Sequence, residues 1–476
     1  MMKQFAFWQN QKIRIAILLF CFAIFNYVYV KHNFSDSNSI VRLALSLCLW
    51  EDGSVIIDKY HQFTIDFAYR DGHYYSCNAP GISFIVLPAV SVTHTILQQL
   101  GRTDHLVEFD PIHTWEPNTN FKLFILSGSV IVSFLCAGAI AVLYLFFRCL
   151  GVVHKTSVLF AIVLGFGTPF ACFATTMYGH SLAASFLIFG LVLGFPAKKQ
   201  SIFCYIVTGL ILAYTVWIEY TAAISVIVLE LLFLSEMKRQ GLSGKQIGWN
   251  TLLMVLGTAP VAVGFFVYNT LTFGSPFQVG YNFVSTNFPQ MDEGFYGIRL
   301  PVFSTFIGSL FGLQDGIVWR SPILILSPFF IIYNIWKNQF RTLNMVCFII
   351  LVYYFLLNSA YAYPDVRHIT ASLPFLIIPI GLAWDSLGFR LKIFVSILLI
   401  VSLIIGFVSM NVPQSTELMQ VPIRILFIFR EFFAGHVRNL LFYVGVNAYL
   451  SLGILLLVWI LAGCFFGKDA FRGQTV

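Results

Sequence analysis

The chain has 476 residues, of which 58% are hydrophobic and 10% charged, whereas an ordinary soluble domain is about 45–50% apolar and about 25% charged. Its mean hydropathy is +0.82, and a water-soluble fold could not bury that much apolar surface. The net charge is +7, but no basic stretch carries the interleaved aromatics typical of nucleic-acid-binding segments. The composition therefore excludes a soluble fold and a nucleic-acid partner, and it indicates an integral membrane protein.

Lys3, Lys12 and Arg14 accompany an apolar run at 13–30 that no small-residue cleavage site follows, which predicts a first membrane helix and not a cleaved signal. Further runs of about 20 residues, the length that spans hydrocarbon, follow along the chain. The predicted spans are 13–30, 121–147, 156–178, 181–196, 202–219, 221–236, 248–270, 320–336, 343–360, 370–388, 392–410 and 441–465. We predict an all-α membrane protein with about 12 transmembrane helices, forming a single polytopic domain over 1–476.

Basic residues support this topology. If the N-terminus is cytoplasmic and the spans alternate, each predicted cytoplasmic loop holds at least two Lys or Arg, as the positive-inside rule requires. The segment 82–100 is apolar enough to span, but an additional span there would place Arg148 and every later basic pair outside. We therefore predict that 82–100 is a helix at the outer interface, which its His94 also favours.

Three long segments are predicted on the outer side. The first, 31–120, holds the interfacial helices and most of the acids, and the second is 272–319. The third, 411–440, is amphipathic and includes Arg424, Arg430 and Arg438, which could meet lipid phosphates. Long ordered loops commonly carry function, so the site is sought here.

Ionisable residues gather at this predicted outer face. Asp36 follows the first span and precedes an amphipathic stretch, and further acids come later in the same loop. The other candidates lie at the outer ends of spans: His180, Glu219, Arg299, Arg320, Asp365, Arg367 and His368. Acids and cations that converge at one membrane face indicate a site for an anionic, lipid-attached ligand. The alternative is that Asp36 only caps a helix and that the other residues are solvated at the interface.

These residues also carry a resemblance. The first loop resembles that of the GT-C membrane glycosyltransferases, the class of protein O-mannosyltransferases and the lipid A aminoarabinose transferase. In that class a catalytic Asp follows the first span, and a second interfacial segment opens with an aromatic–Lys–Pro–Pro-type turn. Here Asp36 fills the Asp position, and the stretch YYSCNAPG at 74–81 resembles the turn. The resemblance covers about the first 380 residues.

The resemblance implies roles for the candidates. Asp36 would be the base, with Asp58 or Asp66 as a second carboxylate. Tyr74 and Tyr75 would stack on sugar together with Trp319. His180, Glu219, Asn78 and His368 would also contact substrate. Two positions depart from the pattern, because Asn78 and Glu219 stand where relatives often carry Lys, so binding of the donor phosphate would move to Arg320, Arg367 or Arg299.

The implied function is the inverting transfer of a sugar from a polyprenyl-phosphate donor to a lipid or glycan acceptor. Membrane lipids are the other expected partners. The expected location is a bacterial inner membrane, with the site facing the periplasm or exterior. The 9 Cys show no zinc spacing, and no metal ligands are assigned. Paired carboxylates leave Mg²⁺ or Mn²⁺ open as a cofactor. A transporter or flippase for a lipid-linked anion, or another glycan polymerase or ligase, are the alternatives.

Overall fold

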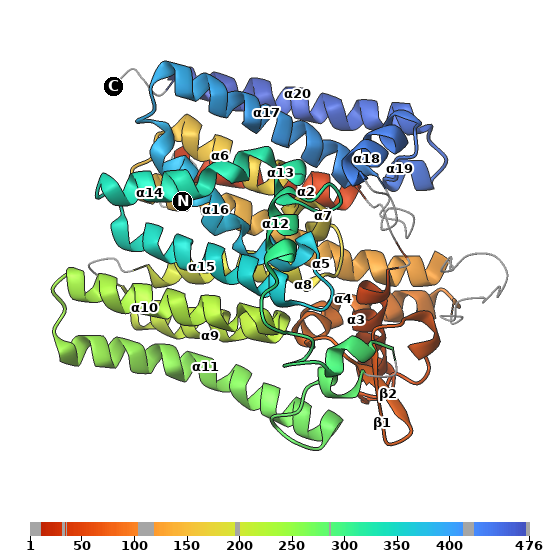
Figure 1. The fold of residues 1–476 in the computed structure, drawn as a ribbon. Coiled ribbons are helices and arrows are strands. Elements are labelled where there is room, and N and C mark those ends of the chain that lie inside the picture. The colour runs from red at the N-terminus through yellow and green to blue at the C-terminus, as the bar shows by residue number, and fades with distance from the viewer. Residues whose placement is uncertain are drawn as a thin grey trace, which may run out of the picture.

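The computed structural model describes residues 11–30, 34, 36–102, 119–195, 200–284, 287–412 and 423–472, with side chains described to residue 466. The chain forms a bundle of roughly aligned helices with one small hairpin (Figure 1). The first helices are α2 (Gln11–Tyr29), α3 (Ser37–Glu51), α4 (Gly81–Gln99), α5 (Thr119–Cys149), α6 (His154–Phe166), α7 (Phe170–Ala174), α8 (Gly179–Gly194), α9 (Ile202–Ile218), α10 (Ala223–Arg239) and α11 (Gly244–Phe273). The others are α12 (Phe303–Phe311), α13 (Ile317–Arg320), α14 (Ser327–Trp336), α15 (Arg341–Ala360), α16 (Leu373–Trp384), α17 (Phe389–Asn411), α18 (Arg424–Phe433), α19 (Leu440–Tyr443) and α20 (Ala448–Arg472).

Each predicted span contains a helix, and the prediction of an all-α membrane protein is confirmed. Within the described ranges, nine helical segments are long and apolar enough to cross a membrane, and four shorter apolar helices accompany them. The predicted span 156–178 is divided, because α6 ends at Phe166 and α7 is a separate short helix. The helix α4 coincides with the segment predicted to be interfacial and is also among the nine; its interfacial placement stays a prediction.

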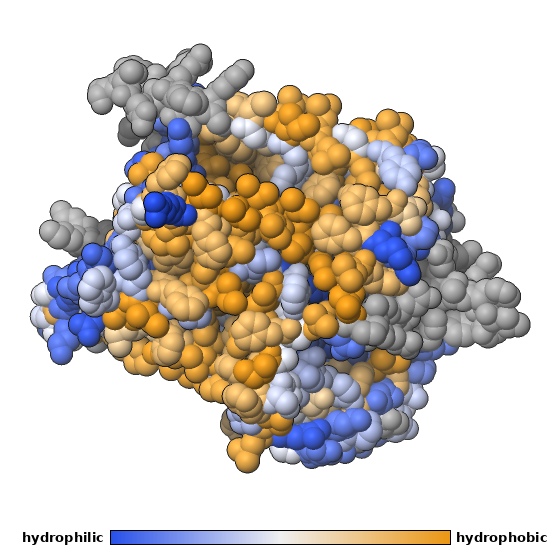
Figure 2. Space-filling model, turned by 45° about the horizontal axis from the view of Figure 1, so that its top comes forward, coloured by the Kyte–Doolittle hydropathy of each residue, from blue (hydrophilic) through white to orange (hydrophobic). Residues whose placement is uncertain are grey.

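The outer surface of the bundle is suited to lipid. Figure 2 shows broad hydrophobic areas between hydrophilic ends. Large apolar side chains are exposed along several of the long helices; on α11 they are Trp249, Leu252, Val255, Leu256, Val263, Phe266, Val267 and Leu271. Exposed apolar residues in such numbers would be unfavourable in water and are favourable in hydrocarbon.

Small residues allow α9 and α11 to approach closely. A Cβ atom on Gly209 would lie 1.8 Å from the backbone oxygen of Met254, and one on Gly257 would lie 1.9 Å from that of Ile206. Neither position can carry a larger residue unless the helices separate. This is the small-residue packing by which membrane helices gain dispersion contacts without a hydrophobic driving force.

The two ends of the bundle differ in structure. In Figure 1 the turns that join α10 to α11 and α14 to α15 lie at the left end. The opposite end carries α3, the hairpin, α18 and α19. The first and third segments predicted to be outer therefore lie at this end, although 31–33, 35, 103–118 and 413–422 of them lie outside the described residues. The second segment, of which 285–286 lie outside the described residues, reaches α12 and α13 in the middle of the view.

The hairpin is built from β1 (Phe67–Arg70) and β2 (His73–Ser76), which pair antiparallel with Phe67 opposite Ser76. Asp71 and Gly72 form its turn with φ values of 50° and 88°, and an Asp-Gly pair suits this left-handed conformation. After the hairpin, α4 begins against α9, because a Cβ atom on Gly81 would lie 2.5 Å from the backbone oxygen of Trp217. The first outer loop is thereby fixed to the bundle.

Candidate functional site

Four helix ends bring the candidate residues together. Asp36 is the N-cap of α3, His180 is the second residue of α8, and Glu219 is the C-cap of α9. The 3-10 helix η6 (Val366–Ser372) carries Arg367 and His368. Backbone groups at helix ends lack partners within the helix, so polar side chains are favoured at these positions.

Asp36 caps a helix, as the alternative to a catalytic role predicted. Its Oδ1 accepts a hydrogen bond of 2.7 Å from the backbone N–H of Ser39. The cap also fixes the carboxylate at the positive end of the α3 dipole, which favours its ionised form. Capping therefore does not remove Asp36 from the site, since it holds the charge in place near Asp66.

Asp66 lies beside α3 and is largely enclosed. Its Oδ2 accepts a hydrogen bond of 2.9 Å from Nδ2 of Asn38. Burial raises the pKa of Asp66, the charges of Arg367 and Arg42 oppose that rise, and the nearby charge of Asp36 adds to it. A carboxylate with a raised pKa is a stronger base than an ordinary Asp.

Arg42 is a member of the site that the sequence analysis missed. Its residue is only 3% exposed, and its Nη1 donates a hydrogen bond of 2.9 Å to the backbone oxygen of Asn38. Arg42 and Glu219 both lie close to Gly179, because a Cβ atom on that glycine would be 3.0 Å from Oε2 of Glu219 and 3.7 Å from Nη2 of Arg42. The available signal was the i, i+4 spacing of Asn38 and Arg42 on one face of a mostly apolar helix.

His180 and Glu219 form the part of the site next to Arg42. The Nδ1 atom of His180 lies 3.3 Å from Oε2 of Glu219, and both side chains are nearly buried. Oε1 of the same carboxylate accepts a hydrogen bond of 3.1 Å from Thr221. The predicted proximity of His180 and Glu219 is thus present, although the sequence gave no reason to expect direct contact.

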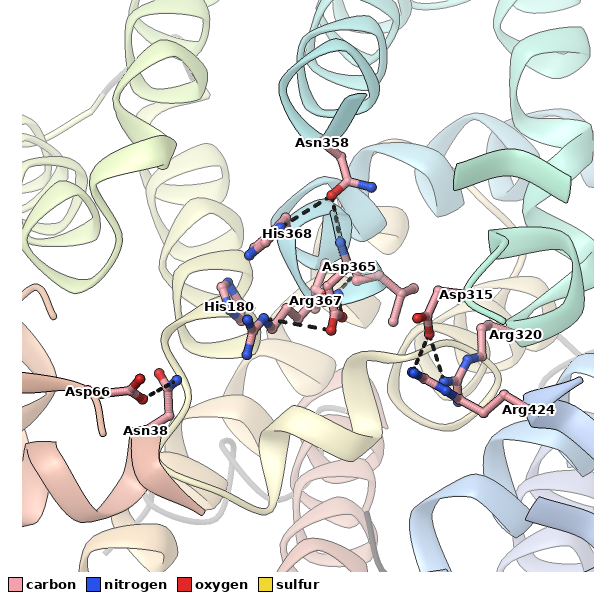
Figure 3. Close-up of polar contacts among 12 residues, drawn as sticks. Asn38, Asp66, His180, Asp315, Arg320, Asn358, Asp365, Arg367, His368 and Arg424 are labelled. Carbon is pink, nitrogen blue, oxygen red and sulfur yellow. Dashed lines mark hydrogen bonds and ion pairs between the residues drawn. The ribbon is translucent and has the colours of Figure 1, made fainter. Parts of the chain in front are cut away.

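Arg367 occupies the centre of the close-up (Figure 3). Its Nε lies 3.9 Å from Oδ2 of Asp365, and its backbone N–H donates to Oδ1 of that residue at 2.8 Å. Among the described residues, its guanidinium group has no hydrogen-bond acceptor. Burial would raise the pKa of Asp365, but Arg367, His368 and the backbone bond together hold it below its ordinary value.

His368 is held by Asn358 of α15. Its Nδ1 lies 3.2 Å from Oδ1 of Asn358, and that oxygen also accepts a hydrogen bond of 3.0 Å from the backbone N–H of Asp365. The rings of His368 and His180 are 5.7 Å apart. His180, Arg367 and His368, which the sequence placed at separate span ends, therefore meet.

Arg320 belongs to a neighbouring cluster. Its Nη2 lies 3.1 Å from Oδ1 of Asp315, and Arg424 of α18 donates to the same oxygen. Figure 3 shows this cluster on the far side of Asp365 from the pair formed by Asp66 and Asn38. The Arg424 charge also acts on Asp365, so the cluster adjoins the centre without contacting it.

Four of the predicted residues are engaged elsewhere. Asp58 accepts a hydrogen bond of 2.7 Å from the backbone N–H of Tyr74, and its other oxygen lies 2.8 Å from Nδ1 of His73. The Tyr74 ring stacks on His61 at 3.7 Å. Tyr75 is buried in the hairpin, and the partly exposed Arg299 pairs with Glu293 at 2.9 Å.

Two further predicted site residues, Asn78 and Trp319, differ in whether their polar atoms are available to a ligand. The Nδ2 atom of Asn78 is buried without a hydrogen-bond partner in the described chain, so this side chain retains an unused donor. Trp319 is 42% exposed and donates through Nε1 to the backbone oxygen of Phe311 at 2.9 Å. Asn78 therefore remains a candidate ligand group, whereas the polar atom of Trp319 is committed to its own segment.

A divalent cation fits these carboxylates poorly. Among the described residues there is no group of three or more His, Cys, Asp or Glu that could hold a metal ion. The Asp66 carboxylate lies in the field of two guanidinium groups, those of Arg367 and Arg42. A metal ion at Asp66 would have to compete with both positive charges.

Comparisons with known proteins give structural similarity alone. No family model matches the chain, and no curated protein matches its sequence. A crystal structure of ArnT from Cupriavidus metallidurans bound to undecaprenyl phosphate is similar, with a TM-score of 0.44 at 12% identity. The apo structure of that protein gives a TM-score of 0.43 at 13% identity. Each comparison covers 82% of this chain and 62% of the ArnT chain, so this chain matches less than two thirds of its length.

Proposed function

We propose that the chain is a membrane glycosyltransferase of the GT-C class. It transfers a sugar from a polyprenyl-phosphate donor to a lipid or glycan acceptor. The observation that carries this proposal is that a guanidinium group and a carboxylate lie near each other at one end of the bundle. The guanidinium of Arg367, which has no hydrogen-bond acceptor in the part of the chain that the structure describes, acts electrostatically on the carboxylate of Asp66, whose pKa is raised. Such a pair suits an anionic leaving group and a hydroxyl nucleophile.

The reaction is a single displacement. The acceptor hydroxyl oxygen attacks the anomeric carbon, its proton passes to a carboxylate, and the bond from the anomeric carbon to the phosphate oxygen breaks. The electron pair of that bond leaves with the polyprenyl phosphate, whose developing charge Arg367 stabilises. Attack opposite the leaving group inverts the anomeric configuration, and the carboxylate supplies general base catalysis.

Two carboxylates are candidates for the proton acceptor. Asp36 caps α3, where the positive end of the helix dipole favours a carboxylate, and Asp66 has the raised pKa. When the environments of two carboxyl groups separate their pKa values, the groups take different roles. We assign proton acceptance to Asp66 and assign to Asp36 the fixed charge that raises its basicity; the reverse assignment is distinguished by the pH profile described below.

The cations are divided between two positions. We assign contact with the leaving phosphate of the donor to Arg367, whereas Arg320 and Arg424 share Asp315 at a neighbouring position. Arg320 therefore acts on the donor through the electrostatic field unless Asp315 releases it. The guanidinium groups can neutralise the leaving phosphate, so the proposed reaction uses no metal ion.

The proposed location is the exoplasmic face of a bacterial inner membrane. The distribution of Lys and Arg supports it, since the loops predicted to be cytoplasmic lie at the end of the bundle opposite to the site. A transporter for the same lipid would place charged groups near mid-membrane. Here the described ionisable groups of the site gather at the helix ends instead.

The test uses cells that lack the chromosomal copy and express a variant. Asp66→Asn and Arg367→Gln should each abolish the glycan that the wild-type protein adds, as measured by mass spectrometry of the cell envelope. Arg430→Gln is the matched control, because Arg430 is exposed on α18 and pairs with Glu431. An unchanged glycan in both site variants would overturn the proposal. Accumulation of an unflipped lipid-linked sugar on the cytoplasmic leaflet would favour the transporter instead.

A further inference from the structure

The two histidines of the site, His180 and His368, each have Nε2 as the unprotonated ring nitrogen. In His368, Nδ1 lies against Oδ1 of Asn358, which already accepts the Asp365 backbone N–H. The amide orientation of Asn358 is fixed independently, because its Nδ2 donates to Ser309 at 2.8 Å. Since Oδ1 can only accept, Nδ1 of His368 must carry the proton.

His180 reaches the same state through a different partner. Its Nδ1 lies 3.3 Å from Oε2 of Glu219. This carboxylate lies across Gly179 from Arg42 and accepts a hydrogen bond from Thr221, and in its ionised form it has only acceptor oxygens. With Glu219 ionised, Nδ1 of His180 therefore also carries the proton.

Both Nε2 atoms are consequently acceptors in neutral rings. A second positive charge beside the Arg367 guanidinium would be repelled, which favours the neutral state. Within the described chain, neither Nε2 has a hydrogen-bond partner. Metal coordination is not the explanation, because no ligand group of three or more His, Cys, Asp or Glu exists among these residues.

We propose that His180 and His368 are the specificity-determining residues for the transferred sugar, and that each accepts a hydrogen bond at Nε2 from a hydroxyl group of a neutral sugar. This inference rests on the proposed function. The rings lie 5.7 Å apart beside Arg367, so a sugar whose phosphate contacts Arg367 has its hydroxyls within reach of both. An ammonium group at this position would lie next to the Arg367 guanidinium, and the nearby carboxylates of Glu219 and Asp365 already face His180 and Arg367, which disfavours an amino sugar.

The experiment measures lipid binding to the purified, full-length protein by native mass spectrometry. The probes are undecaprenyl phosphate, a panel of undecaprenyl-phosphate neutral hexoses, and an undecaprenyl-phosphate amino sugar. We expect the wild-type protein to bind at least one neutral sugar lipid more tightly than the amino sugar lipid. His180→Phe and His368→Phe should each weaken the neutral sugar lipid about tenfold, which corresponds to one hydrogen bond, and leave sugar-free undecaprenyl phosphate unchanged.

The controls separate the outcomes. His368→Gln can place an amide oxygen near the Nε2 position and should recover part of the affinity, whereas His436→Gln, on an exposed residue paired with Glu431, should behave as wild type. Equal weakening of the sugar-free lipid in the Phe variants, or tighter binding of the amino sugar lipid by the wild type, would overturn the assignment. If the wild type binds no polyprenyl-phosphate lipid, the proposed function itself fails.

Discussion

At the scale of single residues, the environment of Asp66 predicts how activity depends on pH. Burial raises its pKa, the charges of Arg367 and Arg42 oppose the rise, and Asp36 adds to it. As the proposed base, Asp66 must be ionised to accept a proton, so we expect activity above this raised pKa and a loss of activity as the pH falls through it. The acid limb should therefore lie above the ordinary Asp value of about 3.9.

The corresponding variants are Asp66→Asn and Asp36→Asn. Asp66→Asn should lower the rate by about 10²-fold or more and remove the acid limb from the remaining activity. Asp36→Asn keeps a good helix cap and removes the charge that raises the Asp66 pKa, so its acid limb should move to lower pH. The measurement is the pH dependence of sugar transfer in membranes. If instead the limb persists in Asp66→Asn and disappears in Asp36→Asn, Asp36 is the base.

Gly179 offers a second test at the residue scale. A Cβ atom there would lie 3.0 Å from Oε2 of Glu219 and 3.1 Å from the backbone oxygen of Ile218. Gly179→Ala should therefore displace Glu219 and lower activity about tenfold while the protein still folds, measured by sugar transfer and by thermal unfolding in detergent. Gly453→Ala is the control, since a Cβ atom there meets nothing within 4 Å. Wild-type activity in Gly179→Ala would show that the position of Glu219 is unimportant.

At the scale of secondary-structure elements, the hairpin and the helix crossings hold together the segments that carry the site. Asp58 joins the segment before the hairpin to β2 by accepting the Tyr74 backbone N–H at 2.7 Å. The resemblance implied catalysis for Asp58 and sugar stacking for Tyr74, and both roles stay predictions. Their observed contacts instead indicate that they hold the loop in shape.

If Asp58 holds the hairpin in place, its substitution should lower the stability of the protein and affect catalysis only weakly. Asp58→Ala should lower the free energy of unfolding by about 1 kcal/mol, the value of one hydrogen bond to a partly exposed charge, and should reduce activity far less than Asp66→Asn. Thermal unfolding and sugar transfer measured on the same samples check this. A loss of activity equal to that of Asp66→Asn, with unchanged stability, would return Asp58 to the catalytic set.

The crossing of α9 and α11 makes a prediction about stability. Gly257→Ala would place a methyl group 1.9 Å from the backbone oxygen of Ile206, so the helices must separate at a cost of about 1–3 kcal/mol. Gly248→Ala, on the same helix α11 with nothing within 4 Å, should be neutral or stabilising by up to about 1 kcal/mol. Differential scanning fluorimetry of both variants checks the contrast, and equal melting temperatures would contradict the close approach.

At the scale of the whole molecule, the distribution of Lys and Arg predicts that the two ends of the bundle lie on opposite sides of the membrane. The hairpin lies at the end that carries the site, and the turn between α10 and α11 lies at the other. Alkaline phosphatase needs disulfides and therefore an oxidising compartment. Inserted at Gly72 it should be active, and inserted at Gly241 it should be inactive. Activity at Gly241 would reverse the topology.

The sequence predicted the spans well and the site in part, for physical reasons. A membrane helix needs about 20 apolar residues, which is a local property that can be read directly. The meeting of His180, Glu219 and Arg367 followed from their shared side of the membrane, but sidedness does not determine contacts. Arg42 was missed because Gly179 and Glu219, which lie near its guanidinium, are distant in sequence. Arg299 shared the predicted side yet pairs with Glu293.

The bond from Arg424 to Asp315 has a consequence for biogenesis. Asp315 accepts one hydrogen bond from Arg320, which is close to it in sequence, and another from Arg424, which follows it by more than a hundred residues. A nascent chain inserted only as far as α17 would already hold Asp36, Asp66 and Arg367, but its charge cluster would lack one of its arginines. The protein therefore completes this charge cluster only after α18 has been synthesised and has packed against the earlier helices.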